Sequence, residues 1–379
     1  MRTFLFFQEK RAKVCALLHA LPKEGESIPP LLEGHGEGLT HTFFNTKFHL
    51  FKMKYLVTGA TGYIGHQLTR RLASLGHSVN ALYRSGTKAK ELENLPGVCL
   101  HKGDLLDPGS LQRAAEGCDA VFHVAAFAKP WHKDPQTFFR INVKGAENVF
   151  CAAKKMGARR VVFTSTAGVI SPSEGSPTSE SSPRRQGFFT HYERSKAQAE
   201  AVAKQMSAGG FETITVNPSR VYGPGRMGAG NPANKMVRLY LQGKFRLLPG
   251  NGKSIGNYVF INDVVEGHIQ AMEKGRGGER YILGGQNASF IEFFEMLAKV
   301  SGKDFRMFKM PLPLMQIGAA AMETMAKLTG TEPLLTPPWV KKYLFDWEHS
   351  TGKAERELGF EPTALEEGLR ATVEWVLGG

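Results

Sequence analysis

Short apolar runs alternate with longer segments of helical periodicity through most of the chain. The first run is Tyr55-Leu56-Val57, which has the length that a buried parallel strand needs. In the segment that follows, residues 67–75, apolar side chains recur at helical spacing. Strands that alternate with helices are typical of α/β folds with a parallel sheet. The further strands that we expect cover residues 78–83, 120–126, 160–168 and 280–285. Residues 98–107 read as a strand that ends in an Asp-led turn, residues 211–225 as a strand that runs into a rigid turn, and residues 257–268 as a strand that leads into a helix. The clearest further helices cover residues 111–118, 138–156, 235–242 and 290–300.

Three glycines separate the first predicted strand from the first predicted helix. Gly59 would allow a tight turn, Gly62 the close approach of phosphate groups, and Gly65 the close packing of helix on strand. A strand, a glycine-rich turn and a helix start together hold a pyrophosphate on backbone N–H groups at the positive end of the helix. An ordinary β–α turn is the alternative, but the flanking strand and helix favour a dinucleotide site.

The end of the second predicted strand bears on the choice between NAD and NADP. Enzymes that use NAD usually carry an acidic residue about 20 residues after the glycines, where it binds the ribose 2′-hydroxyl. Here no Asp or Glu occurs between Gly59 and Lys90, and Arg84 occupies the expected place with Lys88 close behind. A guanidinium at this point suits a 2′-phosphate. We therefore expect a preference for NADP(H), with NAD(H) also possible; a solvated basic turn is the alternative.

Two later stretches offer groups for acid–base chemistry. The strand predicted at residues 160–168 delivers the hydroxyls of Thr164, Ser165 and Thr166, although Ser and Thr at a strand end usually mark only a turn. Further on, Tyr192 and Lys196 are four residues apart and therefore share one face of a predicted helix. Such a pair is common by chance, and only its position after the glycine turn and the hydroxyl-bearing strand makes it informative.

The order of these motifs resembles that of the extended short-chain dehydrogenases/reductases, which include the NAD(P)-dependent epimerase/dehydratase family. The likeness rests on the glycine motif of residues 58–65 and on Tyr192 and Lys196 as Y-x-x-x-K, and it extends from Met53 to about Leu377. Within that superfamily the chain looks most like dihydroflavonol-4-reductase-like proteins and hopanoid-associated sugar epimerases. The closer likeness is carried by residues 217–219, 279–285 and 353–360.

The resemblance implies a Rossmann-type, doubly wound parallel sheet with a smaller C-terminal α/β substrate lobe. The nucleotide-binding part would cover about residues 53–220, and the substrate lobe mainly residues 221–379. The resemblance also implies a catalytic triad of Thr166, Tyr192 and Lys196, with Thr166 in the place of a commoner serine. The residues that it assigns to the cofactor are Gly59, Thr61, Gly62, Tyr63, Ile64, Gly65, Arg84, Lys88, Asp104, Leu105, Val124, Ala125, Ala126, Thr164, Tyr192, Lys196, Pro218 and Val221.

These assignments imply a mechanism in which hydride moves between the nicotinamide and a carbonyl or carbinol carbon while the oxygen gains or loses a proton. A free tyrosine has a pKa of about 10, and a nearby lysine cation can lower that pKa by about 1–3 units. Tyr192 would then be the general acid/base, Lys196 its electrostatic partner and ribose anchor, and Thr166 the group that orients the substrate oxygen. Ala167 and Gly168 follow Thr166 where the family's 4,6-dehydratases place acidic residues, which disfavours a dehydratase.

We therefore expect an NAD(P)-dependent oxidoreductase that acts on a small carbonyl compound or carbinol. A nucleotide-sugar epimerase that retains its cofactor is the alternative among enzymes, and a non-catalytic dinucleotide-binding regulator is the alternative in another class. The sequence does not identify the substrate, because the residues that would shape its site lie in the least patterned stretches. These stretches are residues 129–134, 171–189 and 225–234.

Composition adds few constraints. The chain has 379 residues and a formal net charge of +13, but its basic residues are scattered in pairs. We expect a cationic surface suited to anionic cofactors, and no nucleic-acid site. The four cysteines form no C-x-x-C pair, which suits reduced thiols in the cytoplasm and provides no metal site. We expect a monomer or a homodimer.

Two segments stand outside the regular pattern. Residues 1–52 have no periodicity that would join the core, so we expect a poorly ordered or dispensable extension, with a targeting peptide as the alternative. Residues 314–328 are rich in Ala and Met but are too short and too polar to span a bilayer. We expect them to form a helix that covers the substrate lobe or a partner; peripheral membrane contact is the less favoured alternative.

Overall fold

The computed structural model describes residues 52–226, 228 and 231–378. The chain divides into two units after Phe51, and the described residues all belong to the second unit, Lys52–Gly379. The predicted N-terminal extension therefore lies outside the described residues, apart from Lys52.

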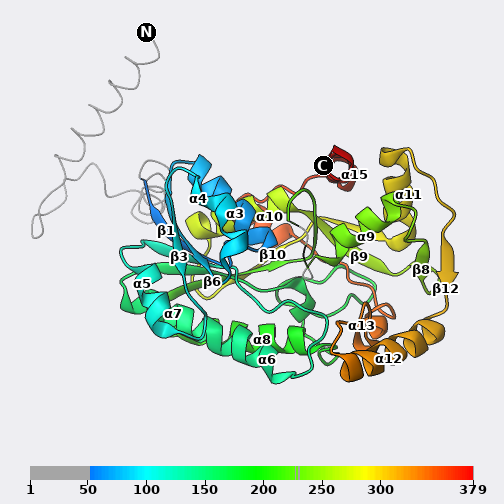
Figure 1. Ribbon diagram of the computed structural model, residues 1–379, viewed down its shortest axis with the longest axis horizontal. Coiled ribbons are helices and arrows are strands. Elements are labelled where there is room, and N and C mark those ends of the chain that lie inside the picture. The colour runs from blue at the N-terminus through cyan, green and yellow to red at the C-terminus, as the bar shows by residue number, and fades with distance from the viewer. Residues whose placement is uncertain (1–51, 227, 229–230, 379) are drawn as a thin grey trace, which may run out of the picture. The chain divides into compact units, whose positions relative to one another are not determined.

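Seven parallel strands form the centre of the second unit (Figure 1). Their order is β10-β6-β5-β4-β1-β2-β3. The strands β1, β2 and β3 follow one another toward one edge of the sheet, and β4, β5, β6 and β10 follow one another toward the other edge. Sheets of this kind bind ligands at the carboxyl ends of the strands, near the point where the order reverses. The strands are β1 (Lys54–Thr58), β2 (Ser78–Tyr83), β3 (Val98–Lys102), β4 (Ala120–His123), β5 (Arg160–Thr164), β6 (Glu212–Pro218) and β10 (Arg280–Leu283).

Helices cover both faces of this sheet, and two separate apolar cores result (Figure 1). Consecutive residues of β1 show why: Val57 packs toward the helices of one face and Leu56 toward those of the other. Both faces are buried, which explains the nearly continuous apolar runs of the strands. The prediction of a doubly wound, Rossmann-type sheet is confirmed. The helices are α3 (Tyr63–Ser74) and α10 (Ile261–Lys274) on one face, and α5 (Pro108–Ala115), α7 (Gly145–Lys155) and α8 (His191–Ala208) on the other.

Shorter elements connect these layers. The turn η2 (Gly86–Lys88) and α4 (Lys90–Glu93) follow β2. The single helix predicted at residues 138–156 is instead three joined segments, α6 (Gln136–Phe139), the π-helical turn η3 (Arg140–Lys144) and α7. The short 3₁₀ turn η4 (Ala167–Val169) follows β5.

The C-terminal part builds a second, smaller α/β arrangement. Its sheets have the orders β11-β9-β7 and β12-β8. Within this part, residues 261–283 return to the parallel sheet as α10 and β10, so the two parts are interleaved along the sequence. No helix among the described residues is long and apolar enough to cross a membrane. The additional elements are β7 (Arg220–Tyr222), α9 (Pro232–Leu241), β8 (Leu247–Pro249), β9 (Ile255–Phe260), β11 (Gln286–Ser289), α11 (Phe290–Ser301), β12 (Phe308–Met310), α12 (Leu312–Thr329), α13 (Pro337–Lys342), α14 (Gly352–Leu358) and α15 (Leu365–Gly378).

Candidate active site

The glycine-rich turn after β1 brings separate chain segments into close approach. Gly59 has φ = +71°, a left-handed backbone conformation that favours glycine. A Cβ at Gly59 would lie 2.7 Å from the backbone of Ala125, and one at Gly65 would lie 2.1 Å from the carbonyl oxygen of Gly59. The packing of the turn therefore requires both glycines. Gly62 is exposed and donates its N–H to the Gly59 oxygen at 2.8 Å.

The N-terminus of α3 keeps its backbone donors open beside this turn. Gly62 is the N-cap residue and supplies no side-chain acceptor, and the first turn of α3 carries no acidic residue. The N–H groups of Tyr63, Ile64 and Gly65 precede the first bond within the helix, from His66, and find no acceptor among the described residues. Free N–H groups at a positive helix end are well suited to phosphate oxygens. The geometry of this turn fits the pyrophosphate of a dinucleotide.

Arg84 and Lys88 lie just beyond the carboxyl end of β2, where the ribose of such a dinucleotide would lie, and both side chains are exposed. Within the described part of the chain, Arg84 makes no hydrogen bond or ion pair. Its guanidinium is thus available to an anionic ligand.

Arg226 joins the glycine turn to the segment after β2, and sequence reasoning missed it. Its guanidinium donates to the carbonyl oxygen of Thr61 at 3.0 Å and to that of Lys88 at 2.6 Å, and it pairs with Glu91 at 2.7 Å. Arg226 lies in a stretch that the pattern assigned only to a substrate-shaping loop. No local motif signals this contact, because its partners are more than a hundred residues away in the sequence.

The turn after β3 is held by one of its own side chains and by one from α7. The Asp104 carboxylate accepts the N–H of Leu106 at 2.9 Å, and Asn148 on α7 donates to the carbonyl oxygen of Leu105 at 2.9 Å. A Cβ at Gly145 would lie 3.0 Å from the Cβ of Leu105, so α7 packs tightly against this turn. Asp104 and Leu105 therefore lie at the same edge of the sheet as the glycine turn, in fixed positions.

Val124, Ala125 and Ala126 follow β4 directly, at this same edge. The N–H of Ala125 donates to Thr58 Oγ1 at 3.3 Å, and that oxygen lies 2.7 Å from Nδ1 of His123. His123 is 1% exposed, and burial lowers its pKa to about 3. A buried neutral histidine bonded within the sheet has a structural role.

The three hydroxyl groups at and just after the end of β5 have different surroundings. Thr164 Oγ1 lies 2.8 Å from Nε2 of His268 on α10, so it is engaged inside the protein, although we expected it to contact the cofactor. Ser165 Oγ is buried without a partner among the described residues. Thr166 is half-buried and caps η4, where its Oγ1 accepts the N–H of Gly168 at 3.2 Å. Because Thr166 Oγ1 is an acceptor in this bond, its hydrogen remains free to be donated to a substrate oxygen.

A capping box starts α8 and places Tyr192 in the first turn. The Thr190 side chain accepts the N–H of Glu193 at 3.1 Å, and the Glu193 carboxylate accepts the N–H of Thr190 in return. Lys196 follows one turn later and is 1% exposed. Its ammonium lies 4.1 Å from the ring centroid of Phe163 on β5 and makes no hydrogen bond within the described residues. A buried ammonium without an acceptor is unfavourable unless a ligand supplies one.

The pKa values of this pair differ from our expectation. Burial lowers the pKa of Lys196 to about 7, and Glu200 opposes that shift. Burial also raises the pKa of Tyr192 above its ordinary value, and the neighbouring Glu193 adds to the effect. In the protein alone, burial therefore dominates the pKa of Tyr192. A tyrosine that must release a proton here needs a further positive charge.

Asn142 explains the π-helical turn η3 and connects two parts of the site. Its amide accepts the N–H of Phe127 at 2.7 Å and donates to Ser195 Oγ at 2.9 Å, and Ser195 in turn donates to the carbonyl oxygen of Tyr192. The extra residue in the helical turn accompanies this inward-facing amide. These bonds hold the loop after β4 and the first turn of α8 in fixed positions relative to each other.

Pro218 ends β6 and is buried, and Val221 lies half-buried in β7. Between them, Ser219 Oγ is buried without a partner among the described residues. The segment thus offers an available hydroxyl between two residues that the resemblance assigns to the cofactor.

Glu193 also forms an ion pair that the sequence did not reveal. Lys342, the last residue of α13, pairs with the Glu193 carboxylate, and Arg184 lies 3.9 Å from it. The Glu193 side chain is 2% exposed and that of Lys342 is 13% exposed. The Lys342 ammonium lies 4.3 Å from the ring centroid of Trp347 and 4.8 Å from that of Trp339. The C-terminal part is thereby fastened to the residue next to Tyr192.

We expect Lys342→Met to lower the free energy of unfolding by about 3–5 kcal/mol, because it leaves the buried Glu193 carboxylate without its main partner. The double variant Glu193→Gln/Lys342→Met should recover most of this loss, since glutamine can still complete the capping box. Urea denaturation of both variants measures the difference. Equal losses in the two variants would show that Lys342 acts through its packing against Trp339 and Trp347.

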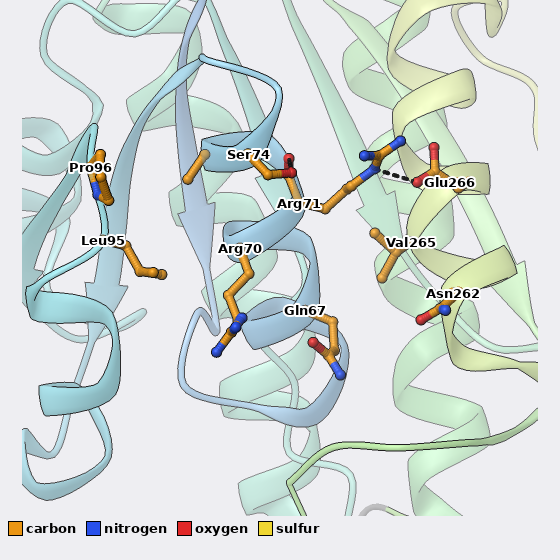
Figure 2. Close-up of a pocket in the computed structure, with 10 residues that line it drawn as sticks. Gln67, Arg70, Arg71, Ser74, Leu95, Pro96, Asn262, Val265 and Glu266 are labelled. Atoms are coloured by element: carbon orange, nitrogen blue, oxygen red, sulfur yellow. Dashed lines mark hydrogen bonds and ion pairs between the residues drawn. The ribbon is translucent and has the colours of Figure 1, made fainter. Parts of the chain in front are cut away.

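A cavity of about 620 Å³ lies between α3 and α10, the two helices that cover one face of the sheet (Figure 2). Arg70, Gln67 and Asn262 line it, and the ion pair of Arg71 with Glu266, at 2.6 Å, lies at its side. It contains none of the residues that we expected to be catalytic. The residues predicted to be catalytic lie elsewhere, after β5 and in the first two turns of α8.

Comparisons with known proteins identify the family of the chain. A family model described as "NAD dependent epimerase/dehydratase family" matches residues 55–284. A putative dihydroflavonol 4-reductase of Synechocystis is 31% identical over 85% of this chain and 94% of its own length. A farnesyl-dihydroquinoline-oxide ketoreductase of Stigmatella aurantiaca is 30% identical over 81% of this chain and 92% of its own length. The UDP-glucose 4-epimerase of Thermotoga maritima, solved with UDP-glucose, is 24% identical, covers 86% of this chain and 99% of its own, and has a TM-score of 0.72, which shows a common fold.

Proposed function

Because the chain belongs to the NAD-dependent epimerase/dehydratase family, we propose that it is an NADPH-dependent reductase of a carbonyl group on a largely apolar small molecule. The observation that carries this proposal is the buried, unpartnered ammonium of Lys196 one turn after Tyr192. The names of two relatives at 30% identity or more, a reductase and a ketoreductase, support this direction of the reaction.

The residues present fit a nicotinamide dinucleotide. The open N–H groups of α3 would hold the pyrophosphate, and Lys196 would bond to the ribose hydroxyls and so gain the acceptor that it lacks. Ser165 Oγ and Ser219 Oγ are two further buried polar atoms with no partner in the described part of the chain. When bound, the nicotinamide supplies or accepts the hydride.

The residues of this chain manage the proton that accompanies the hydride. Thr166 donates its free O–H hydrogen to the substrate oxygen and so orients the carbonyl group. Tyr192 transfers its phenolic proton to that oxygen as negative charge develops. Lys196 lies one helical turn from Tyr192, and its positive charge, when protonated, favours the phenolate that remains. In the oxidation direction, Tyr192 would need a further positive charge beside it, which an oxidised nicotinamide would supply.

We expect Arg84→Ala to weaken NADPH binding by about 10- to 150-fold and NADH binding far less. A charge-assisted hydrogen bond contributes about 1.5–3 kcal/mol, and only NADPH carries the 2′-phosphate that would accept it. Titration of each nucleotide into the full chain measures the two affinities. The control is Arg113→Ala, which changes an exposed arginine on a different element, the helix α5. This variant should alter neither affinity. Equal losses for both nucleotides in Arg84→Ala would remove the argument for NADP(H).

A nucleotide-sugar epimerase is the second candidate, and cofactor retention distinguishes it. A reductase must release its nucleotide in each turnover, whereas an epimerase keeps it bound. We expect purified protein to exchange added NADPH freely. Protein that carries a bound nucleotide which does not exchange would favour the epimerase.

The decisive experiment is a screen of ketones with alkyl or isoprenoid chains, and of nucleotide sugars, for consumption of NADPH and NADH. We expect turnover with an apolar ketone. If no compound is turned over although NADPH binds, the dinucleotide-binding regulator becomes the better proposal.

A further inference from the structure

The helix α12 exposes four of its large apolar residues and buries only two small ones. Its two buried residues are Ala319 and Ala326. Large apolar side chains of the opposite face are exposed instead, at positions that share one side of the helix. We call these residues the α12 stripe: Leu314, 57% exposed, Ile317, 67%, Met325, 58%, and Leu328, 78%.

Exposed apolar residues are concentrated around this helix. Leu334, before α13, is 67% exposed, and Leu344, just after α13, is 66% exposed. With the α12 stripe, they make six of the eleven exposed large apolar side chains among the described residues. Figure 1 shows α12 and α13 together at the margin of the C-terminal part. Scattered apolar residues on a surface need no explanation, but such a concentration marks an interaction site.

We propose that the α12 stripe docks on the surface of a lipid bilayer that contains anionic lipids. Residues 305–345 carry five basic and two acidic residues. Both acidic residues are already neutralised, Glu323 by Lys327 at 2.9 Å and Glu332 by Lys129 at 3.0 Å. Lys309 and Lys341 are exposed and make no ion pair within the described residues. Apolar side chains on α12, with free cations on the neighbouring elements β12 and α13, complement an anionic headgroup layer above an apolar interior.

A second copy of the chain is the less suitable occupant. If two copies met through this surface, the Lys309 and Lys341 ammonium groups of one copy would approach those of the other. Like charges would then repel each other across the interface. Each copy would also carry a net charge of +13. Because no described helix can cross a membrane, the contact would lie in the plane of the bilayer surface.

Docking at this surface would place the candidate active site next to the bilayer. Lys129, in the loop after β4, pairs with Glu332 just beyond α12, and Lys342 of α13 pairs with the neighbour of Tyr192. An apolar substrate dissolved in the lipid would then be close to the catalytic helix. This consequence rests on the proposed function, whereas the docking itself does not.

Flotation of the full chain with vesicles tests the proposal without any substrate. The vesicles contain phosphatidylcholine alone or phosphatidylcholine mixed with phosphatidylglycerol. We expect the wild type to float with the mixed vesicles and to dissociate at high salt. The variant Leu314→Gln/Ile317→Gln/Leu328→Gln should bind at least about 100-fold more weakly, because each aliphatic side chain that enters the lipid contributes a factor of about 10 or more.

A matched control replaces three exposed leucines elsewhere, Leu75→Gln/Leu106→Gln/Leu377→Gln, and should bind vesicles like the wild type. Melting temperatures of both triple variants should not fall, since all six positions are exposed. Wild type that floats with neither vesicle, or equal losses in both variants, would overturn the proposal. So would a wild-type dimer, measured by light scattering, that becomes monomeric only in the α12 variant. Flotation without any turnover of a ketone would leave the docking standing and count against the reductase alone.

Discussion

Tyr192→Phe is expected to lower turnover by about 10²- to 10⁴-fold while NADPH affinity stays nearly unchanged. The variant keeps the half-buried ring and the capping box of α8 but removes the proton that would go to the substrate oxygen. General acid–base catalysis typically contributes a factor of this size. The open N–H groups of α3 and the ammonium of Lys196 remain, so the cofactor should still bind. Steady-state kinetics on a ketone from the screen and nucleotide titration measure the two quantities.

Tyr343→Phe is the matched control for this variant. Tyr343 is half-buried, like Tyr192, and its ring contacts the ring of Phe290. It lies outside the predicted triad, so its replacement should leave turnover close to that of the wild type. If Tyr192→Phe, folded and loaded with cofactor, keeps nearly normal turnover, then Tyr192 is not the general acid/base.

The second large effect is expected for Lys196→Met, which should weaken nucleotide binding, abolish most turnover and yet stabilise the fold. Burial lowers the Lys196 pKa from 10.5 to about 7, so between these pH values the unfolded chain binds more protons than the folded protein. The stability of the wild type should therefore rise with pH across this window, and the full cost of the buried amine is present below pH 7. Removing that cost should raise the free energy of unfolding by roughly 2–5 kcal/mol at pH 7.

Urea denaturation across the window from pH 7 to about 10 measures the effect of Lys196→Met. The stabilisation should shrink as pH rises, because the wild-type lysine loses its proton in the unfolded chain as well. Lys204→Met, at an exposed position of the same helix, should show neither the stabilisation nor its pH dependence. A Lys196→Met variant that is less stable than the wild type at neutral pH would mean that the ammonium is stabilised in the folded protein.

The contrast between these two variants separates the catalytic proposal from the regulatory one. A dinucleotide-binding regulator needs Lys196 for the ribose but has no use for the Tyr192 proton. In that case Tyr192→Phe would be silent in every assay, and Lys196→Met would affect binding alone. The reductase requires both residues for turnover and only Lys196 for tight cofactor binding.

Local sequence signals were sufficient for the elements and for most of the site. The alternation of apolar runs with helical segments predicts a parallel sheet because each strand is covered on both faces. The three glycines are recognisable because they recur every third residue between a predicted strand and a predicted helix. Tyr192 and Lys196 share a helix face because they are four residues apart, and that spacing is independent of the rest of the fold.

Tertiary structure alone decided the features that depend on how distant segments meet. The contact of Arg226 with Thr61 and the ion pair of Lys342 with Glu193 each join residues more than a hundred positions apart, so no local pattern can indicate them. The pKa of Lys196 could not be predicted either, because it follows from burial by several elements and not from its neighbours in the helix. The sequence by itself determined which residues could form a dinucleotide site and a Tyr–Lys pair. Only the folded chain decided which of these groups lose water, which remain without a partner, and that the large side chains of α12 face outward, because solvent exposure is a property of the packed molecule and not of the residue.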